Sequence, residues 1–175
     1  AFDANTSVLS RRNRPRIEHA SFLAKSQVTR LSHLGACIVV QPHLMSLPTF
    51  ASAPSVPGLR NTALRWLLDA GVHVAGSSDA PVAGFDPLDG IRSAVSRRTT
   101  RGEVYEPDQC VALEEALVMY TRAAAEAAGA GATSGTITAG KRADFVVLDC
   151  ALDDVTLARA RVAPTILGGR VVYEA

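Results

Sequence analysis

The first 80 residues alternate short apolar runs with amphipathic segments, and a glycine follows each amphipathic segment. Residues 15–20 form a first strand candidate, and the pattern of 21–34 is helical. Residues 36–41 are continuously apolar and rich in β-branched side chains, which is typical of a strand buried on both faces of a parallel sheet. A second helix over 61–70 and a strand over 72–76 repeat the order. This alternation predicts parallel strands joined by crossover helices.

The pattern changes after residue 87. Residues 88–97 are predicted to be helical, 99–108 form a polar loop, and the Ala-, Leu- and Glu-rich stretch 112–128 is a strong helix candidate. Two strand-rich pieces follow at 143–148 and 162–173, the second with a predicted turn at Gly168 and Gly169, and without further crossover helices.

Small residues dominate 129–136 and indicate a boundary between two parts of the chain. We therefore predict an α/β part over 1–130 and a β part over 131–175. The proline-rich segment 43–58 is predicted to be a long loop of the kind that often carries function.

Composition fits a folded globular protein: 47% of the 175 residues are hydrophobic and 20% are charged. The net charge of +1 favours neither nucleic acid nor a membrane surface as a partner, and the one basic cluster, 11–16, is interpreted as a surface turn. Three widely spaced cysteines form no disulfide pattern, which favours a reducing cytoplasm. No run of about twenty apolar residues could span a bilayer.

Two side chains at predicted strand ends are candidates for chemistry. His19 ends the first strand and Asp79 follows the strand over 72–76. Parallel α/β folds place their chemistry at the carboxyl ends of strands, where imidazole can bind a metal and a carboxylate can bind a cation or take a proton from water. A hydrogen-bonded histidine and a turn-capping aspartate are the structural alternatives, and the spacing alone leaves both open.

His43 follows the middle strand and is a candidate for holding substrate at the same edge. His33 lies on a helix, and His73 begins a strand at its amino end, where stability rather than reactivity is expected.

Residues 135–141 match part of a phosphate-binding loop, GxxxxGK, but Arg142 stands where the loop needs a hydroxyl for Mg²⁺. No strand precedes this segment and a strand follows it, so we interpret its glycines as turn residues. A phosphate-ester hydrolase is therefore disfavoured.

Several segments together, in this order, resemble the amidohydrolase superfamily, in the branch that contains the YtcJ-like proteins and N-substituted formamide deformylase. They are RIEHA (16–20), QPH (41–43), GSSDAPV (76–82), EAL with YT (115–121), GTITAGKRADFVVLD (135–149) and TILGGRVVY (165–173).

The resemblance implies the C-terminal part of a metal-dependent (β/α)₈ barrel, with strands six to eight at 15–20, 36–41 and 72–77, plus the C-terminal strands of a small β-sandwich. It implies that His19 is a metal ligand and that Asp79 is both a metal ligand and the general base. The expected reaction is the hydrolysis of a non-peptide C–N bond, in an amide or cyclic amide, by metal-activated water. Zinc is the expected metal, with manganese or iron as alternatives.

The family's other ligands have no counterpart here, and a divalent metal needs three or four. We therefore expect this chain alone to be inactive, with barrel strands one to five absent and the apolar inner faces of the remaining strands exposed. Self-association over these faces, as a homo-oligomer, is one expected consequence. The alternative is a non-catalytic interaction module with a vestigial site.

Overall fold

The computed structural model describes residues 15–51 and 56–175. The predicted basic cluster falls mostly outside the described residues, because Arg11, Arg12 and Arg14 precede them. The same holds for part of the predicted loop, including Pro54.

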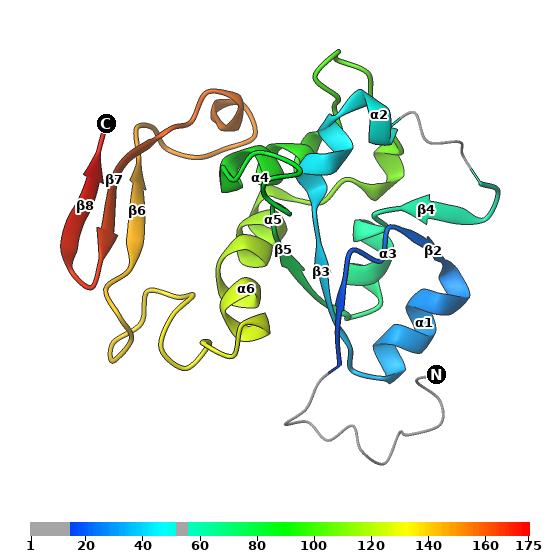
Figure 1. The fold of residues 1–175 in the computed structure, drawn as a ribbon, viewed down its shortest axis with the longest axis horizontal. Coiled ribbons are helices and arrows are strands. Elements are labelled where there is room, and N and C mark those ends of the chain that lie inside the picture. Colours follow the sequence, from blue (N-terminus) through cyan, green and yellow to red (C-terminus); the bar gives the residue numbers. More distant parts are fainter. Residues whose placement is uncertain (1–14, 52–55) are drawn as a thin grey trace.

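A three-stranded parallel sheet lies at the centre of the larger lobe (Figure 1). Its order is β1 (Arg16–Glu18), β3 (Cys37–Val40) and β5 (His73–Gly76). Ile38 of the middle strand pairs with Ile17 on one side and with Val74 on the other. These are the three parallel strands that the apolar runs predict.

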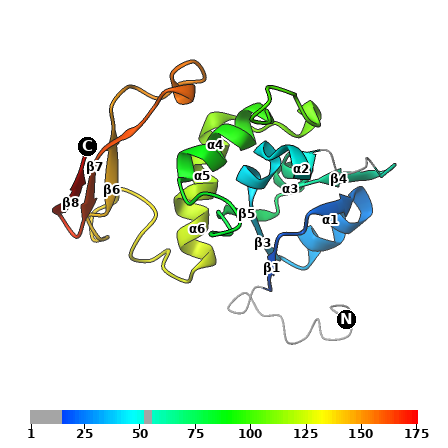
Figure 2. The ribbon, with the colours of Figure 1, turned by 45° about the horizontal axis from the view of Figure 1, so that its top comes forward.

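Helices cover the sheet from both sides (Figure 2). Ile38 and Val40 face the main core, which they share with Leu64 and Leu67 of α3 (Leu64–Asp69) and with Val28 of α1 (Lys25–His33). On the opposite face, three sheet residues pack with Ala123 of α6 (Arg122–Ala127): Cys37, Val39 and Ala75. The expectation that one face would be exposed is wrong for β3, whose four residues are all buried, because α6 lies over it.

Two of the predicted helices begin later than the apolar pattern indicates. Residues 22–24 form β2 (Phe22–Ala24), which pairs antiparallel with β4 (Leu59–Asn61). The amide of Ala24 donates to the side chain of Gln27 at 2.8 Å, and this contact starts α1 at Lys25. Likewise Asn61 ends a strand, and α3 begins only at Leu64. Pairing between the two segments overrides their helical pattern.

The predicted loop after β3 contains two short helices, the 3₁₀ helix η2 (Pro42–Ser46) and α2 (Pro48–Ala51). The long helix predicted over 112–128 is two helices, α5 (Leu113–Tyr120) and α6. Thr121 separates them with a non-helical backbone (φ −121°, ψ −93°), and its hydroxyl donates to the carbonyl of Leu117. Between β5 and these helices lie α4 (Pro87–Ser96) and η3 (Pro107–Gln109).

The smaller lobe is an antiparallel sheet of β6 (Phe145–Leu148), β7 (Val162–Leu167) and β8 (Arg170–Glu174), with η4 (Thr156–Ala158) between the first two strands. The two-glycine turn at Gly168 and Gly169 joins β7 to β8, as predicted, and both residues have positive φ. Residues 129–144 contain no helix or strand, and the predicted domain boundary within them stays a prediction. Across residues 15–51 and 56–175, no helix is long and apolar enough to cross a membrane.

Candidate functional site

The carboxyl ends of the three parallel strands lie along one edge of the sheet, and the candidate residues follow them directly. The amide of His19 donates to the carbonyl of Val39 at 2.8 Å, so β1 and β3 remain paired up to this residue. The amide of Ser77 donates to Val40 at the same distance and joins β5 to the same edge. His19 and the Ser77–Asp79 segment therefore flank the end of β3 on its two sides.

His19 and Asp79 both have left-handed backbones, with φ of 67° and 57°. This region is uncommon for residues other than glycine, and such residues are enriched at functional sites. Within the described residues, neither side chain makes a hydrogen bond. The turn-capping alternative for Asp79 is not what the structure has: Asp86 caps α4, where its carboxylate accepts from the amide of Leu88 at 2.9 Å.

Residues at the end of β3 reach the loop that carries Asp79. The amide nitrogen Nε2 of Gln41 donates to the Ser77 hydroxyl at 2.9 Å, and Gln41 is buried. Nδ1 of His43 lies 3.3 Å from the carbonyl oxygen of Gly84. His43 is thus at the predicted edge, but one of its ring nitrogens already has a protein partner.

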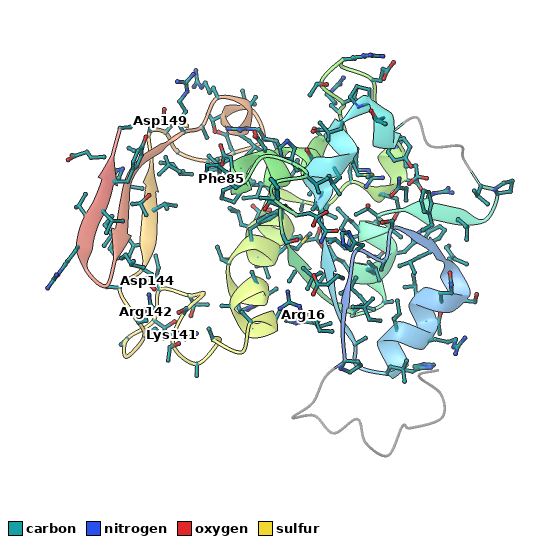
Figure 3. The ribbon with its side chains drawn as sticks, viewed as in Figure 1. Arg16, Phe85, Lys141, Arg142, Asp144 and Asp149 are labelled. Atoms are coloured by element: carbon teal, nitrogen blue, oxygen red, sulfur yellow. The ribbon has the colours of Figure 1, made fainter. Side chains whose placement is uncertain are left out.

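A cavity of about 210 Å³ opens beside this loop. His43, Ser77 and Ser78 line it together with Phe85, Asp86, Pro87, Gly90 and Tyr120. His19 and Asp79 are not among its lining residues. Phe85 is 85% exposed, and Figure 3 shows it beside α4, on the side of the C-terminal sheet.

Tyr120 is one of the residues that line this cavity. Its hydroxyl donates to the carbonyl of Ser77 at 3.3 Å, and burial raises the pKa of the phenol above its ordinary value. A Cβ added at Gly76 would come within 2.5 Å of the Tyr120 ring, and one at Gly90 would also clash with the ring. The two glycines therefore make room for an aromatic ring behind the end of β5.

The described residues do not form a complete metal site. No three His, Cys, Asp or Glu side chains of residues 15–51 and 56–175 lie close enough together to hold an ion. His19 and Asp79 offer donor types that divalent metals accept, but they are two, and a stable site needs three or four. Within the described residues, His19 and Asp79 therefore do not complete a metal site by themselves.

The structure agrees with the interpretation of residues 135–141 as a turn. Nζ of Lys141 donates to the carbonyls of Gly131 at 2.6 Å and Ser134 at 3.1 Å. The ammonium group therefore makes hydrogen bonds to the backbone of its own loop. Figure 3 shows Lys141 at the foot of β6, on the segment that leads into this strand.

Comparison with known sequences identifies the family. The sequence profile described as "Amidohydrolase family" matches residues 1–173, nearly the whole chain. This chain belongs to the amidohydrolase family. The motif series read from the sequence is thereby confirmed.

Two curated amidohydrolase relatives agree with the predicted branch. The chain is 36% identical to an N-substituted formamide deformylase of Arthrobacter pascens over 168 residues, covering 91% of this chain and 31% of the relative. It is 31% identical to the putative amidohydrolase YtcJ of Bacillus subtilis (strain 168) over 169 residues, covering 91% and 32%. The chain thus spans about a third of the length of these relatives.

Solved structures confirm the fold. An uncharacterized metal-dependent hydrolase from Pyrococcus horikoshii superposes with a TM-score of 0.66 at 26% identity, over 81% of this chain and 30% of that one. An adenosine deaminase from Xanthomonas campestris with bound zinc gives 0.67 at 20% identity, over 89% and 36%, a likeness that shows the fold alone. The fold is that of the C-terminal part of an amidohydrolase barrel, followed by strands of a smaller β domain.

The sequence does not predict several residues that lie at this edge of the parallel sheet. The motif series contains Gln41 and Tyr120 but assigns neither of them a role, and no sequence signal marks Gly84 or Phe85. A glutamine at the end of a buried strand is a signal for Gln41, because a buried amide needs hydrogen-bond partners. The contact between Tyr120 and the glycines joins segments distant in sequence, and no local pattern encodes it.

Proposed function

We propose that the protein is a metal-dependent hydrolase of non-peptide C–N bonds, in amides or cyclic amides. One observation carries the proposal. His19 and Asp79 lie at the same sheet edge, just after the two strands that flank β3, with left-handed backbones and side chains that make no hydrogen bonds within the described residues. Family membership supports a hydrolase, and one relative, an N-substituted formamide deformylase, supports an amide-type substrate.

In this proposal His19 supplies one imidazole ligand and Asp79 one carboxylate ligand. The remaining ligands come from parts of the barrel outside these 175 residues, consistent with relatives about three times as long. Zinc is the favoured metal because a zinc-bound structure shares this fold, and manganese and iron are the alternatives. A metal at this edge would lower the pKa of water and polarise the substrate carbonyl.

Asp79 would accept the proton of the attacking water. A carboxylate without a hydrogen-bond donor of its own protein keeps its lone pairs available for this role. His43 would contact the substrate through Nε2, because only its Nδ1 faces Gly84. The chain alone, without the other ligands, would be inactive.

The proposal is tested by hydrolysis assays on the protein at its full natural length, with N-substituted formamides and a hydantoin as probes. Asp79→Asn should lower kcat by about a hundredfold or more, since it removes the base and keeps the shape. Asp154→Asn is the matched control: it makes the same chemical change at an exposed residue between β6 and η4, away from the cavity and from the ends of the parallel strands. Equal activity of the Asp79→Asn variant and the unaltered protein would sink the assignment.

The second candidate is a non-catalytic, self-associating module. One observation favours it: all five residues of β8 are exposed, including Val171, Val172 and Tyr173. Light scattering after size-exclusion chromatography separates the two candidates. A module of this kind should form a defined oligomer and bind no metal, whereas a monomer with bound metal supports the enzyme.

A further inference from the structure

The loop that joins β5 to α4, residues 77–86, carries Asp79 and is held on both sides of it by the end of β3. Gln41 donates to the hydroxyl of Ser77, two residues before Asp79, at 2.9 Å. His43 contacts the carbonyl of Gly84, five residues after Asp79, at 3.3 Å. Among the hydrogen bonds of the described residues, the His43 contact is the one that joins residues 82–85 to another element.

His43 stands on a rigid base. Four of the five residues of η2 are buried, and the Ser46 hydroxyl donates to the carbonyl of His43 at 2.8 Å. A Cβ added at Gly84 would lie 3.3 Å from Cε1 of the His43 ring, tighter than an ordinary contact. The glycine therefore lets the loop backbone approach the imidazole closely.

The partner of Nδ1 fixes the form of the imidazole. A carbonyl oxygen only accepts hydrogen bonds, so Nδ1 must carry the proton that it donates. The neutral ring then has its lone pair on Nε2, and the protonated ring keeps the same Nδ1–H. The contact with Gly84 therefore exists in both protonation states of His43.

We propose that His43 is a positioning residue: its Nδ1–H holds the 77–86 loop, and through that loop it sets the position of Asp79. With Gln41 it forms a two-point clamp from the end of β3. The clamp suits Asp79 because a left-handed backbone at a residue other than glycine persists only where its surroundings hold it. The catalytic part of this inference rests on the proposed role of Asp79, and the structural part does not.

Two substitutions of His43 distinguish the roles of its two ring nitrogens. In His43→Asn the side-chain amide replaces Nδ1–H and can still donate to Gly84, but the group at Nε2 is lost. In His43→Gln the amide reaches the position of Nε2, and the donor to Gly84 is lost. His33→Gln, on the exposed surface of α1, makes the same chemical change away from the site.

Hydrogen exchange of the full-length protein, followed by mass spectrometry, measures how firmly the 77–86 loop is held and needs no assay of activity. His43→Gln should speed exchange of the amides of residues 82–85 about three- to tenfold, the size of one lost hydrogen bond. His43→Asn and His33→Gln should leave it unchanged. A peptide from β3 serves as a check on general unfolding, and faster exchange there in His43→Gln alone would assign His43 to stability and overturn the clamp.

Kinetics test the link to Asp79. His43→Gln should lower kcat about tenfold or more with little change in KM, because a displaced base slows the chemical step. His43→Asn should mainly raise KM. Equal losses of kcat in both variants, or none in either, overturn the positioning role. If the unaltered protein hydrolyses nothing, the proposed function fails, and the exchange result still decides whether His43 holds the loop.

Discussion

The parallel sheet and the C-terminal antiparallel sheet of this chain differ most in how they are covered. All four residues of β3 are buried, with helices over both faces, whereas all five residues of β8 are exposed. Both strands are rich in valine, so composition does not set them apart. The larger lobe contains its own core, and the smaller sheet presents an apolar surface that a longer protein or a partner could cover.

The largest loss of unfolding free energy is expected on substitution of Arg97, which lies in the larger lobe and is 1% exposed. Its guanidinium donates to the carbonyls of Asn61, Thr62 and Tyr105 and pairs with Glu106 at 3.2 Å. Burial lowers the pKa of Arg97 and raises the pKa of Glu106. The charge of each residue opposes the pKa shift of the other, so each stabilises the charged form of its partner. Arg97→Met should cost about 3–5 kcal/mol, because it removes the ion-pair partner of the Glu106 carboxylate and the guanidinium donor to three carbonyls.

Urea denaturation measures this loss, and Arg98→Met is the control. Arg98 is exposed, and its side chain contacts the carbonyl of Gly102 at 3.1 Å. A cost below about 1 kcal/mol is expected for it. Similar losses in the two variants would contradict the structural role of the buried guanidinium.

The next largest loss of stability comes from a pair of substitutions that compares the two sheets directly. Leu64 is fully buried under the parallel sheet, and Leu64→Ala should destabilise the protein by about 2–5 kcal/mol. Val172 is 58% exposed, and Val172→Ala should cost less than about 0.5 kcal/mol. Thermal and urea unfolding give both values. A loss at Val172 close to that at Leu64 would show that β8 is covered in solution and would break the comparison.

A smaller effect, dependent on pH, is expected at Glu115. Two hydrogen bonds from Arg65, at 2.7 and 2.9 Å, lower the pKa of this carboxyl below its ordinary value of 4.5. A lowered pKa in the folded state stabilises the protein above about pH 4.5, and this contribution is lost as the pH falls through the folded-state pKa.

Glu115→Gln should therefore cost about 0.5–1 kcal/mol at pH 7, a modest value because the pair is partly exposed, and less at pH 3. Glu114→Gln, in the same first turn of α5 but exposed, controls for the helix dipole. Urea midpoints at the two pH values measure the difference. A destabilisation by Glu115→Gln that is larger at pH 3 than at pH 7 would contradict the predicted direction of the pH dependence.

The sequence predicts the fold where local pattern and tertiary packing agree. The apolar run of β3 and the glycine turn between β7 and β8 are of this kind. It fails at Phe22 and Asn61, because their pairing in β2 and β4 depends on a partner about 40 residues away. It also fails at Thr121, since one non-helical residue within a helix-forming stretch has no strong local signal.

Candidate residues at strand ends could be predicted because topology alone brings them to one edge, as with His19 and Asp79. Their surroundings could not. The contacts of His43 with Gly84 and of Tyr120 with Gly76 and Gly90 depend on the path of loops over tens of residues.

The metal content of the full-length protein tests the central claim most directly. After dialysis, elemental analysis should find zinc, manganese or iron bound to the unaltered protein and to His33→Ala, whose substitution lies on an exposed helix surface. His19→Ala should lose most of that metal, because it removes one of few ligands. A protein that binds no divalent metal, or a His19→Ala variant that keeps all of it, would contradict the assignment of this sheet edge as part of a metal centre.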